Sequence, residues 1–217
     1  MQEQPFFSVI ICTYNRKNLV RRAIDSLINQ EEKDWEAVIV DDGSSDDTLS
    51  FIKHYLDFDR RFSYIYHGNK GQAQSKNDGI AVSIGKYITF LDSDDEYKSE
   101  HLSFRKKILT EQPDIELLHG GVEIIGNPYV PDFNDSTRKI HLSECVIGGT
   151  FFIKREAMMR INGFSLTKYG EDKLLFDKAL ELGLNILKTD FPTYIYHREG
   201  TDSICDSIGV KKIHPLR

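Results

Sequence analysis

The sequence has few cysteines, few prolines and no long apolar run. Its 217 residues include 6 prolines and 3 cysteines, which are Cys12, Cys145 and Cys205. Because the cysteines are odd in number and far apart, they indicate a reducing compartment and argue against a disulfide framework or a structural zinc site. No apolar run approaches the roughly 20 residues that span a bilayer, and the first residues lack the basic and apolar regions of a signal peptide. We therefore expect no transmembrane segment and no leader.

Basic residues form no extended patch. The formal net charge is −6, and the densest basic run is Arg105, Lys106 and Lys107, which we interpret as a solvated helix face. Because nucleic-acid binding needs a basic surface, we expect no nucleic-acid partner. Hydrophobic residues make up 40% of the chain, which is enough for one sizeable core.

Short apolar segments alternate with amphipathic ones through the first half of the chain. This pattern predicts strands at residues 8–12, 35–40, 62–66 and 87–91. Strands that alternate with helices indicate a mostly parallel sheet with right-handed crossovers. We expect Asn15 to cap the first helix, and Ser44 and Asp47 to form a capping box on the second.

The second half of the chain is less regular. Residues 115–118 are typical of a strand, which residues 122–125 would extend or pair with as a hairpin. Residues 126–143 are rich in polar residues and proline and predict a long loop, of the kind that is often functional. Late strands are expected at residues 185–189 and 193–197.

Polar clusters follow three of the predicted strands. Thr13 and Tyr14 follow the first strand, Asp41 and Asp42 the second, and the sequence Asp92-Ser93-Asp94 a later one. The carboxyl ends of parallel strands meet at one edge of a sheet, where open α/β folds bind ligands. We therefore expect one binding crevice along this edge.

The Asp92-Ser93-Asp94 sequence has the oxygen-rich pattern of a metal site. Its carboxylates suit Mg²⁺ or Mn²⁺ that also holds a phosphorylated substrate. The alternative is an acidic turn that caps the next helix. For Asp42, the alternatives are a hydrogen bond to a base or ribose and a simple turn.

Four further residues have a functional and a structural interpretation. Lys76 lies near a predicted helix start, which favours phosphate, although a solvated helix start has the same pattern. Asp172 is a candidate general base, but acids in a first helical turn also offset the helix dipole. His197 is a candidate metal ligand or a structural histidine, and Arg198 is a candidate for gripping a diphosphate.

The motifs, taken in order, resemble those of the family-2 glycosyltransferases, which have the GT-A fold. The resemblance covers about residues 6–200. It rests on the segments SVIICTYNR, VIVDDGSSDDT, NKGQAQSKNDGI, YITFLDSDD, GGTFFIKR and GFSLTKYGEDKLLF. It implies an α/β fold with a Rossmann-like, mostly parallel central sheet flanked by helices and a small acceptor-side subdomain.

The resemblance also implies roles for most of the candidate residues. Residues that would line the base and ribose are Thr13, Tyr14, Arg16 and Asp42. Lys76 would lie on the diphosphate side, at a position where the family more often has arginine. Asp94 would bind the metal, Asp92 the ribose or the metal, and His197 would lie close to both metal and diphosphate. Asp172 matches the catalytic base of the family.

The sequence therefore predicts an inverting glycosyltransferase that uses a nucleotide-diphosphate sugar, expected to be UDP-linked, with Mg²⁺ or Mn²⁺. Residues 1–115 would form the nucleotide-sugar half, residues 116–200 the acceptor half, and residues 201–217 a tail. The expected acceptor is a saccharide or lipid-linked saccharide, in polysaccharide or glycan biosynthesis. Such an enzyme would be cytoplasmic, and peripheral at the inner membrane face if its acceptor is lipid-linked.

Two alternatives stay open, and so does a homodimer. One is a non-catalytic nucleotide-sugar binding module. The other is a sugar nucleotidyltransferase, which would normally need a glycine-rich loop after the first strand, where this chain has Cys12 to Arg16 without glycine.

Overall fold

A computed structural model of the chain describes residues 4–135 and 137–199. In these residues, seven strands form the main sheet in the order β11-β6-β10-β4-β1-β2-β3. They are β1 (Phe7–Thr13), β2 (Trp35–Asp41), β3 (Phe62–Tyr66), β4 (Tyr87–Phe90), β6 (Leu117–His119), β10 (Phe152–Lys154) and β11 (Ile186–Lys188). The strands β3, β2, β1 and β4 run parallel to one another, whereas β10 is antiparallel to both β4 and β6. The mostly parallel sheet predicted from the sequence is confirmed.

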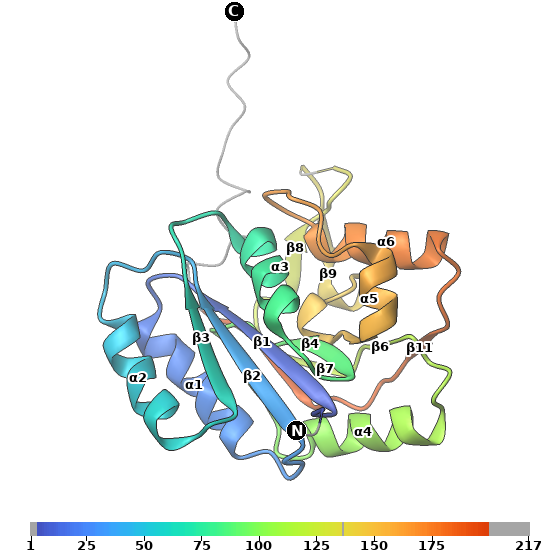
Figure 1. The fold of residues 1–217 in the computed structure, drawn as a ribbon. Coiled ribbons are helices and arrows are strands. Elements are labelled where there is room, and N and C mark those ends of the chain that lie inside the picture. The colour runs from blue at the N-terminus through green and yellow to red at the C-terminus, as the bar shows by residue number, and fades with distance from the viewer. Residues whose placement is uncertain (1–3, 136, 200–217) are drawn as a thin grey trace, which may run out of the picture.

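Six α-helices of the described residues pack around this sheet (Figure 1). They are α1 (Lys17–Ile28), α2 (Thr48–Phe58), α3 (Gln72–Val82), α4 (His101–Glu111), α5 (Arg155–Ile161) and α6 (Glu171–Glu181). Buried residues of α1, α2 and α4 belong to one core cluster, and those of α3, α5 and α6 to another. Side chains alternate between the faces of a strand, so Val9 and Ile11 of β1 lie in the first cluster and Ile10 in the second. The helices therefore cover both faces of the sheet.

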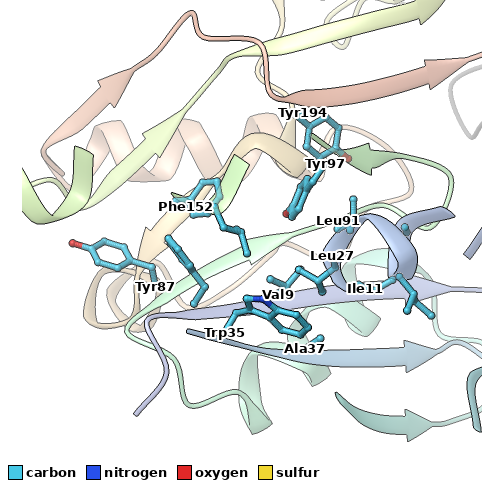
Figure 2. Packing of buried hydrophobic residues seen from close by; sticks show 14 of the residues in the cluster. Val9, Ile11, Leu27, Trp35, Ala37, Tyr87, Leu91, Tyr97, Phe152 and Tyr194 are labelled. Atoms are coloured by element: carbon cyan, nitrogen blue, oxygen red, sulfur yellow. The ribbon is translucent and has the colours of Figure 1, made fainter. Parts of the chain in front are cut away.

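The first core cluster contains more buried aromatic residues than the second. Figure 2 shows Val9 and Leu27 beside the indole of Trp35, with Ile11 further along β1. At its other end, Tyr97 and Tyr194 meet edge to face with their ring centroids 5.7 Å apart. This end lies directly after β4, so the core supports the acidic turn that follows that strand.

A second, smaller sheet extends the fold beyond β4. It consists of β5 (Glu96–Tyr97), β12 (Tyr194–Arg198) and β7 (Val122–Gly126), in that order. The prediction that residues 122–125 extend the preceding strand or pair with it is therefore wrong. Instead, β7 lies parallel to β12, because Gly120 and Gly121, both with positive φ, redirect the chain after β6.

The segment predicted as a loop at residues 126–143 contains regular structure. A hairpin of β8 (Tyr129–Pro131) and β9 (Lys139–His141) is followed by the 3₁₀ turns η1 (Leu142–Glu144) and η2 (Gly148–Thr150). The hairpin lies near α6 (Figure 1), and the Tyr169 hydroxyl donates to the Pro131 carbonyl at 2.7 Å. The long polar excursion is thus attached to the rest of the fold.

Two predicted helix caps are not formed. The first helix starts at Lys17 without a side-chain cap, because Asn15 has a φ of 51° and its side chain accepts from the Ser45 amide. The predicted capping box is also absent from α2, which starts at Thr48 with no side-chain cap bond from Asp47. The Asn15 side chain therefore joins two loops, and the Asp47 side chain does not cap α2.

The prediction that residues 105–107 form a solvated helix face is wrong for Arg105. Its side chain is fully buried, and its Nη2 donates to the Gly120 carbonyl at 2.6 Å. The guanidinium also lies 5.8 Å from the centroid of the Phe152 ring, and a planar, weakly hydrated cation is favourable over an aromatic face.

No helix of residues 4–135 and 137–199 is long and apolar enough to cross a bilayer. Strands from both halves of the chain, such as β4 and β10, share the main sheet. The assignment of the halves to donor and acceptor stays a prediction, and the predicted tail at residues 201–217 lies outside the described residues.

Candidate active site

A cleft of about 880 Å³ opens at the carboxyl ends of the parallel strands. Seven of the predicted site residues line it, namely Thr13, Tyr14, Arg16, Asp42, Asp92, Asp94 and Asp172. The first six lie at or just after the carboxyl ends of β1, β2 and β4, which meet at one edge of the sheet, and Asp172 lies in the first turn of α6. The predicted site residues Lys76, His197 and Arg198 are not among the described residues that line the cleft.

The Asp92-Ser93-Asp94 sequence forms a tight turn after β4. The Asp95 amide donates to the Asp92 carbonyl at 3.0 Å and closes the turn. The Asp94 carboxylate lies 2.7 Å from Nη1 of Arg16, and the Asp92 carboxylate accepts from the Gln72 side chain at 3.3 Å. The acidic turn is therefore held by one contact within it and by contacts from two other segments, the loop after β1 and the start of α3.

The surroundings of Asp92 disfavour the charged form of its carboxyl group. Burial, partly offset by Lys76 and reinforced by Asp94 and Asp172, raises the pKa of Asp92 to about 6. A carboxylate that is disfavoured in this way gains from a cation that binds to it.

The buried Asp95 stabilises the acidic turn. Its carboxylate accepts from the Tyr194 hydroxyl at 2.6 Å and from the His197 amide at 2.8 Å. Burial raises the pKa of Asp95 well above its ordinary value, and Asp92 and Asp94 reinforce this rise. Asp95 is not one of the site residues predicted from the sequence, although its place in the acidic run of residues 92–96 was a signal. It joins the turn to β12.

His197 and Arg198 both lie on β12. The His197 Nε2 is 2.9 Å from Glu96 Oε1, so the imidazole contacts a carboxylate that does not line the cleft. Arg198 is nearly buried and donates through Nη2 to the Tyr129 carbonyl at 3.4 Å. The roles predicted for these two residues at the metal and the diphosphate stay predictions.

The part of the cleft predicted to bind the base and ribose has one exposed ring and two buried polar groups. Tyr14 is 47% exposed, so its ring is accessible for stacking. The Asp42 carboxylate accepts from the amides of Lys70 at 2.6 Å and Gly71 at 2.9 Å, and so fastens the loop before α3. Thr13 is 3% exposed, and its hydroxyl has no hydrogen-bond partner within the described residues. An unpaired buried hydroxyl beside a cleft is a ready contact for a ligand.

Asp172 is held at the start of α6. Its Oδ2 accepts from the Gly148 amide at 2.9 Å, and its Oδ1 lies 3.1 Å from Nζ of Lys76. The same ammonium lies 3.3 Å from Oε1 of Glu171. Burial by itself would lower the pKa of Lys76, but the carboxylates of Asp172, Glu171 and Asp92 raise it well above its ordinary value.

The far wall of the cleft is formed partly by the β8–β9 hairpin. Phe133, which follows β8, stacks on Tyr169 with ring centroids 6.4 Å apart. Gly170, the residue before α6, has a φ of 75°, and a Cβ on it would lie 2.1 Å from the Phe133 ring. Glycine at this position therefore lets the aromatic wall lie directly beside the helix turn that carries Asp172.

The carboxylates of the acidic turn suit Mg²⁺ or Mn²⁺ only if oxygen atoms of a substrate complete the coordination of the ion. In the described part of the chain, no group of three or more histidine, cysteine, aspartate or glutamate side chains is arranged to hold a metal ion. Asp92 and Asp94 provide two carboxylates at the cleft. Mg²⁺ is commonly bound by one or two carboxylates together with substrate phosphates. These residues therefore fit an ion that is shared with a diphosphate.

Solved structures with a similar fold include two glycosyltransferases. S. aureus TarS, in complex with UDP-GlcNAc, matches with a TM-score of 0.77 and 23% identity, over 91% of this chain and 60% of that chain. The mannosyltransferase PcManGT from Pyrobaculum calidifontis, in complex with GDP-Man and Mn²⁺, matches with a TM-score of 0.70 and 21% identity, over 91% of this chain and 57% of that chain. The GT-A fold predicted from the motifs is confirmed.

Curated relatives are similar mainly over the first half of the chain. The GalNAc(5)-diNAcBac-PP-undecaprenol beta-1,3-glucosyltransferase of Campylobacter jejuni is 43% identical over 101 residues, which is 46% of this chain and 33% of the relative. Glycosyltransferase GlyA of Streptococcus pneumoniae is 33% identical over 148 residues, which is 68% of this chain and 20% of the relative. The chain thus spans less than half the length of these relatives. Its residues 8–119 match the family described as "Glycosyl transferase family 2", and the chain therefore belongs to that family.

Proposed function

We propose that this chain transfers a sugar from a nucleotide-diphosphate donor, preferably a UDP-sugar, to an acceptor hydroxyl with inversion at the anomeric carbon. The observation that carries this proposal is that Asp172 lines the same cleft as Asp92 and Asp94. A carboxylate for the acceptor and a carboxylate pair for the leaving diphosphate are the two parts that a direct displacement needs.

In this mechanism, the nucleotide lies against Thr13 and Tyr14, and its diphosphate faces the acidic turn. When bound at Asp92 and Asp94, a Mg²⁺ or Mn²⁺ ion supplies positive charge that stabilises the leaving diphosphate. Arg16, which contacts Asp94, supplies further positive charge at the same place.

Asp172 acts on the acceptor side. It takes the proton from the attacking hydroxyl while the new bond forms from that oxygen to the anomeric carbon. The bond from the anomeric carbon to the diphosphate oxygen breaks in the same step, and its electron pair leaves with the diphosphate. A single displacement of this kind inverts the configuration of the sugar.

The comparisons support the classes of donor and acceptor. TarS was solved with UDP-GlcNAc and PcManGT with GDP-Man, and the Campylobacter jejuni relative is named for a lipid-linked oligosaccharide acceptor. We propose a saccharide or lipid-linked saccharide as the acceptor, in the assembly of a polysaccharide or glycan.

The test is a release assay for UDP or GDP with a panel of nucleotide-sugars and Mn²⁺, first with water and then with saccharide acceptors. Asp172→Asn should lower turnover by about 10²–10⁴-fold, the usual contribution of a general base, while calorimetry should find UDP binding nearly unchanged. Glu181→Gln at the other end of α6 is the matched control. Unchanged turnover in Asp172→Asn contradicts the base assignment.

Two further outcomes separate the remaining alternatives. If the wild-type protein binds UDP but turns over no donor in the panel, the chain is a binding module and the proposed activity is wrong. Asp94→Ala should weaken Mn²⁺-dependent UDP binding by about tenfold or more, because a lost charged ligand costs more than about 1.4 kcal/mol. Calorimetry that shows equal affinity contradicts the metal-ligand assignment.

A further inference from the structure

The ammonium of Lys76 faces the base instead of the cleft. Lys76 lies in the second turn of α3, in the nucleotide half of the chain, and its side chain is 2% exposed. Its Nζ lies 3.1 Å from Asp172 Oδ1 and 3.3 Å from Glu171 Oε1, 96 and 95 residues further along the chain. Buried lysines are rare unless paired, so these two contacts account for its position.

This geometry differs from that expected of a diphosphate-binding lysine. The described residues that line the cleft include Asp172 but not Lys76, and the Asp172 side chain is 27% exposed. The ammonium therefore lies behind the carboxylate. A diphosphate in the cleft would reach it only if Asp172 and Glu171 moved away.

The Asp172 carboxylate has one partner on each oxygen. Lys76 contacts Oδ1, and the Gly148 amide donates to Oδ2 at 2.9 Å. Two contacts on opposite oxygens fix the rotation of a carboxylate. The approach of Gly148 is close, because a Cβ on this residue would lie 2.2 Å from Asp172 Oδ1.

The remaining surroundings hold the ammonium in place. Nζ lies 4.9 Å from the centroid of the Phe164 ring and 5.8 Å from that of Phe90, within the range of a cation–π contact. The other titratable groups that act on it are Asp92 after β4 and Cys12 in β1. The lysine thus lies at the centre of a buried cluster that joins the ends of β1 and β4 to α6.

We infer that Lys76 is a positioning residue for the base: together with the Gly148 amide, it holds the Asp172 carboxylate in the orientation that receives the acceptor proton. This inference rests on the proposed function. It assigns Lys76 to the proton-transfer side of the reaction and removes it from the diphosphate side.

The test compares Lys76→Met and Lys76→Arg in steady-state kinetics, using the nucleotide-sugar that the wild-type protein turns over best. Misplacing a catalytic group by about 1 Å costs about 100-fold in rate, so Lys76→Met should lower kcat by about this factor. KM for the donor and the Kd of UDP with Mn²⁺ should change by less than about threefold, because a transition-state contact is lost rather than a binding contact. Lys76→Arg, which keeps a cation between the two carboxylates, should recover most of the rate.

Gly148→Ala tests the other contact and should give the same pattern of lowered kcat with retained UDP affinity. Lys86→Met, which removes an exposed lysine outside the cleft, is the matched control and should behave as the wild type. If Lys76→Met leaves kcat unchanged but weakens UDP binding by about tenfold, Lys76 is a donor-binding residue and the inference is wrong.

Lys76→Met leaves two partly buried carboxylates without their cation, which lowers folding stability. The double variant Lys76→Met/Glu171→Gln avoids this problem because it removes one charge of each sign. Glu171→Gln is its control. The double variant is expected to show the same selective loss of kcat, and equal kcat in the double variant and Glu171→Gln overturns the inference.

A spectroscopic measurement separates this inference from the proposed activity. The amide resonance of Gly148 reports its hydrogen bond to Asp172. In Lys76→Met it should move toward its position in Asp172→Ala, and in Lys76→Arg it should stay near the wild-type position. If the wild type turns over no donor, the proposed function is wrong, and this resonance still decides whether Lys76 positions Asp172. An unchanged resonance in Lys76→Met means that it does not.

Discussion

At the scale of single residues, two buried threonines near the cleft differ in what their hydroxyls contact. Thr13 is 3% exposed and lines the cleft, and its Oγ1 has no partner among the described residues. Thr150 is 1% exposed, and its Oγ1 donates to the Ile147 carbonyl at 2.7 Å and accepts from the Gly120 amide at 3.0 Å. The first hydroxyl is available to a nucleotide, and the second stabilises the fold.

Replacing Thr13 by valine should therefore weaken UDP binding without destabilising the protein. Loss of one hydrogen bond, worth about 0.5–1.5 kcal/mol, corresponds to a roughly 2- to 12-fold rise in Kd. Calorimetry with UDP and Mn²⁺ measures this change, and urea denaturation measures stability. Thr150→Val is the matched control and should show the reverse, a loss of stability with UDP affinity retained. Equal Kd values for wild type and Thr13→Val contradict a nucleotide contact.

At the scale of secondary-structure elements, the connection from α3 to β4 depends on close packing at Gly85. A Cβ on Gly85 would lie 2.5 Å from Ser8 Oγ and 2.6 Å from the Ser8 amide nitrogen. The Gly85 amide donates to Ser8 Oγ at 2.7 Å, so the start of β4 is attached directly to the start of β1. This contact sets where β4 begins, and therefore how far the Asp92 turn reaches beyond the sheet.

Gly85→Ala should destabilise the protein by about 1–3 kcal/mol, the usual cost of overpacking, and more if the backbone has to shift. Gly68→Ala is a suitable control, because a Cβ at Gly68 would meet no atom within 4 Å, and exposed substitutions usually change stability by less than about 0.5 kcal/mol. Urea denaturation of both variants at one pH measures the difference. Equal urea midpoints for Gly85→Ala and Gly68→Ala would mean that the close approach of Ser8 leaves room for a side chain at Gly85.

Elements with a clear period were predictable from the sequence, and those made by distant pairing were not. The apolar runs at β1, β2 and β4 matched the structure closely, because buried parallel strands have a strong local pattern. The pairing of β7 with β12 joins residues about 70 positions apart, as in Val122 opposite Tyr194, and no local pattern indicates such a partner. The same limit applies to Arg105, whose charge predicted solvent exposure although two aromatic rings and a backbone carbonyl enclose it.

At the scale of the whole molecule, stability depends on pH through His119, a half-buried histidine that packs against the second core cluster. Burial, reinforced by Lys188 and Arg105, lowers the pKa of His119 from 6.5 to about 4. His119 packs against Phe176 with ring centroids 4.9 Å apart. As the pH falls from 6.5 toward 4, the unfolded chain binds a proton at this imidazole before the folded protein does. Stability is therefore complete above pH 6.5 and is lost as the pH falls through this window.

His119→Phe should reduce this acid sensitivity. Between about pH 7.5 and about pH 5, the wild type should lose roughly 1–2 kcal/mol more stability than the variant, after allowance for partial exposure of the ring. Urea denaturation at the two pH values gives the comparison. The control is His54→Gln, which changes an exposed histidine on α2 and should keep the wild-type difference. An identical pH dependence in His119→Phe and wild type contradicts the assignment.

The sequence by itself determined the class of fold, the edge of the sheet where the cleft lies and seven of the residues that line it. It did so because strand periodicity and polar strand ends are local properties, and parallel strands bring their carboxyl ends together. Only the tertiary structure decided which of those side chains meet. Lys76 was assigned to the diphosphate side from its place near a helix start, yet it contacts Asp172, 96 residues away. Contacts of this kind depend on how α3 and α6 pack on the same face of the sheet, and that packing is set by the whole core rather than by any one segment.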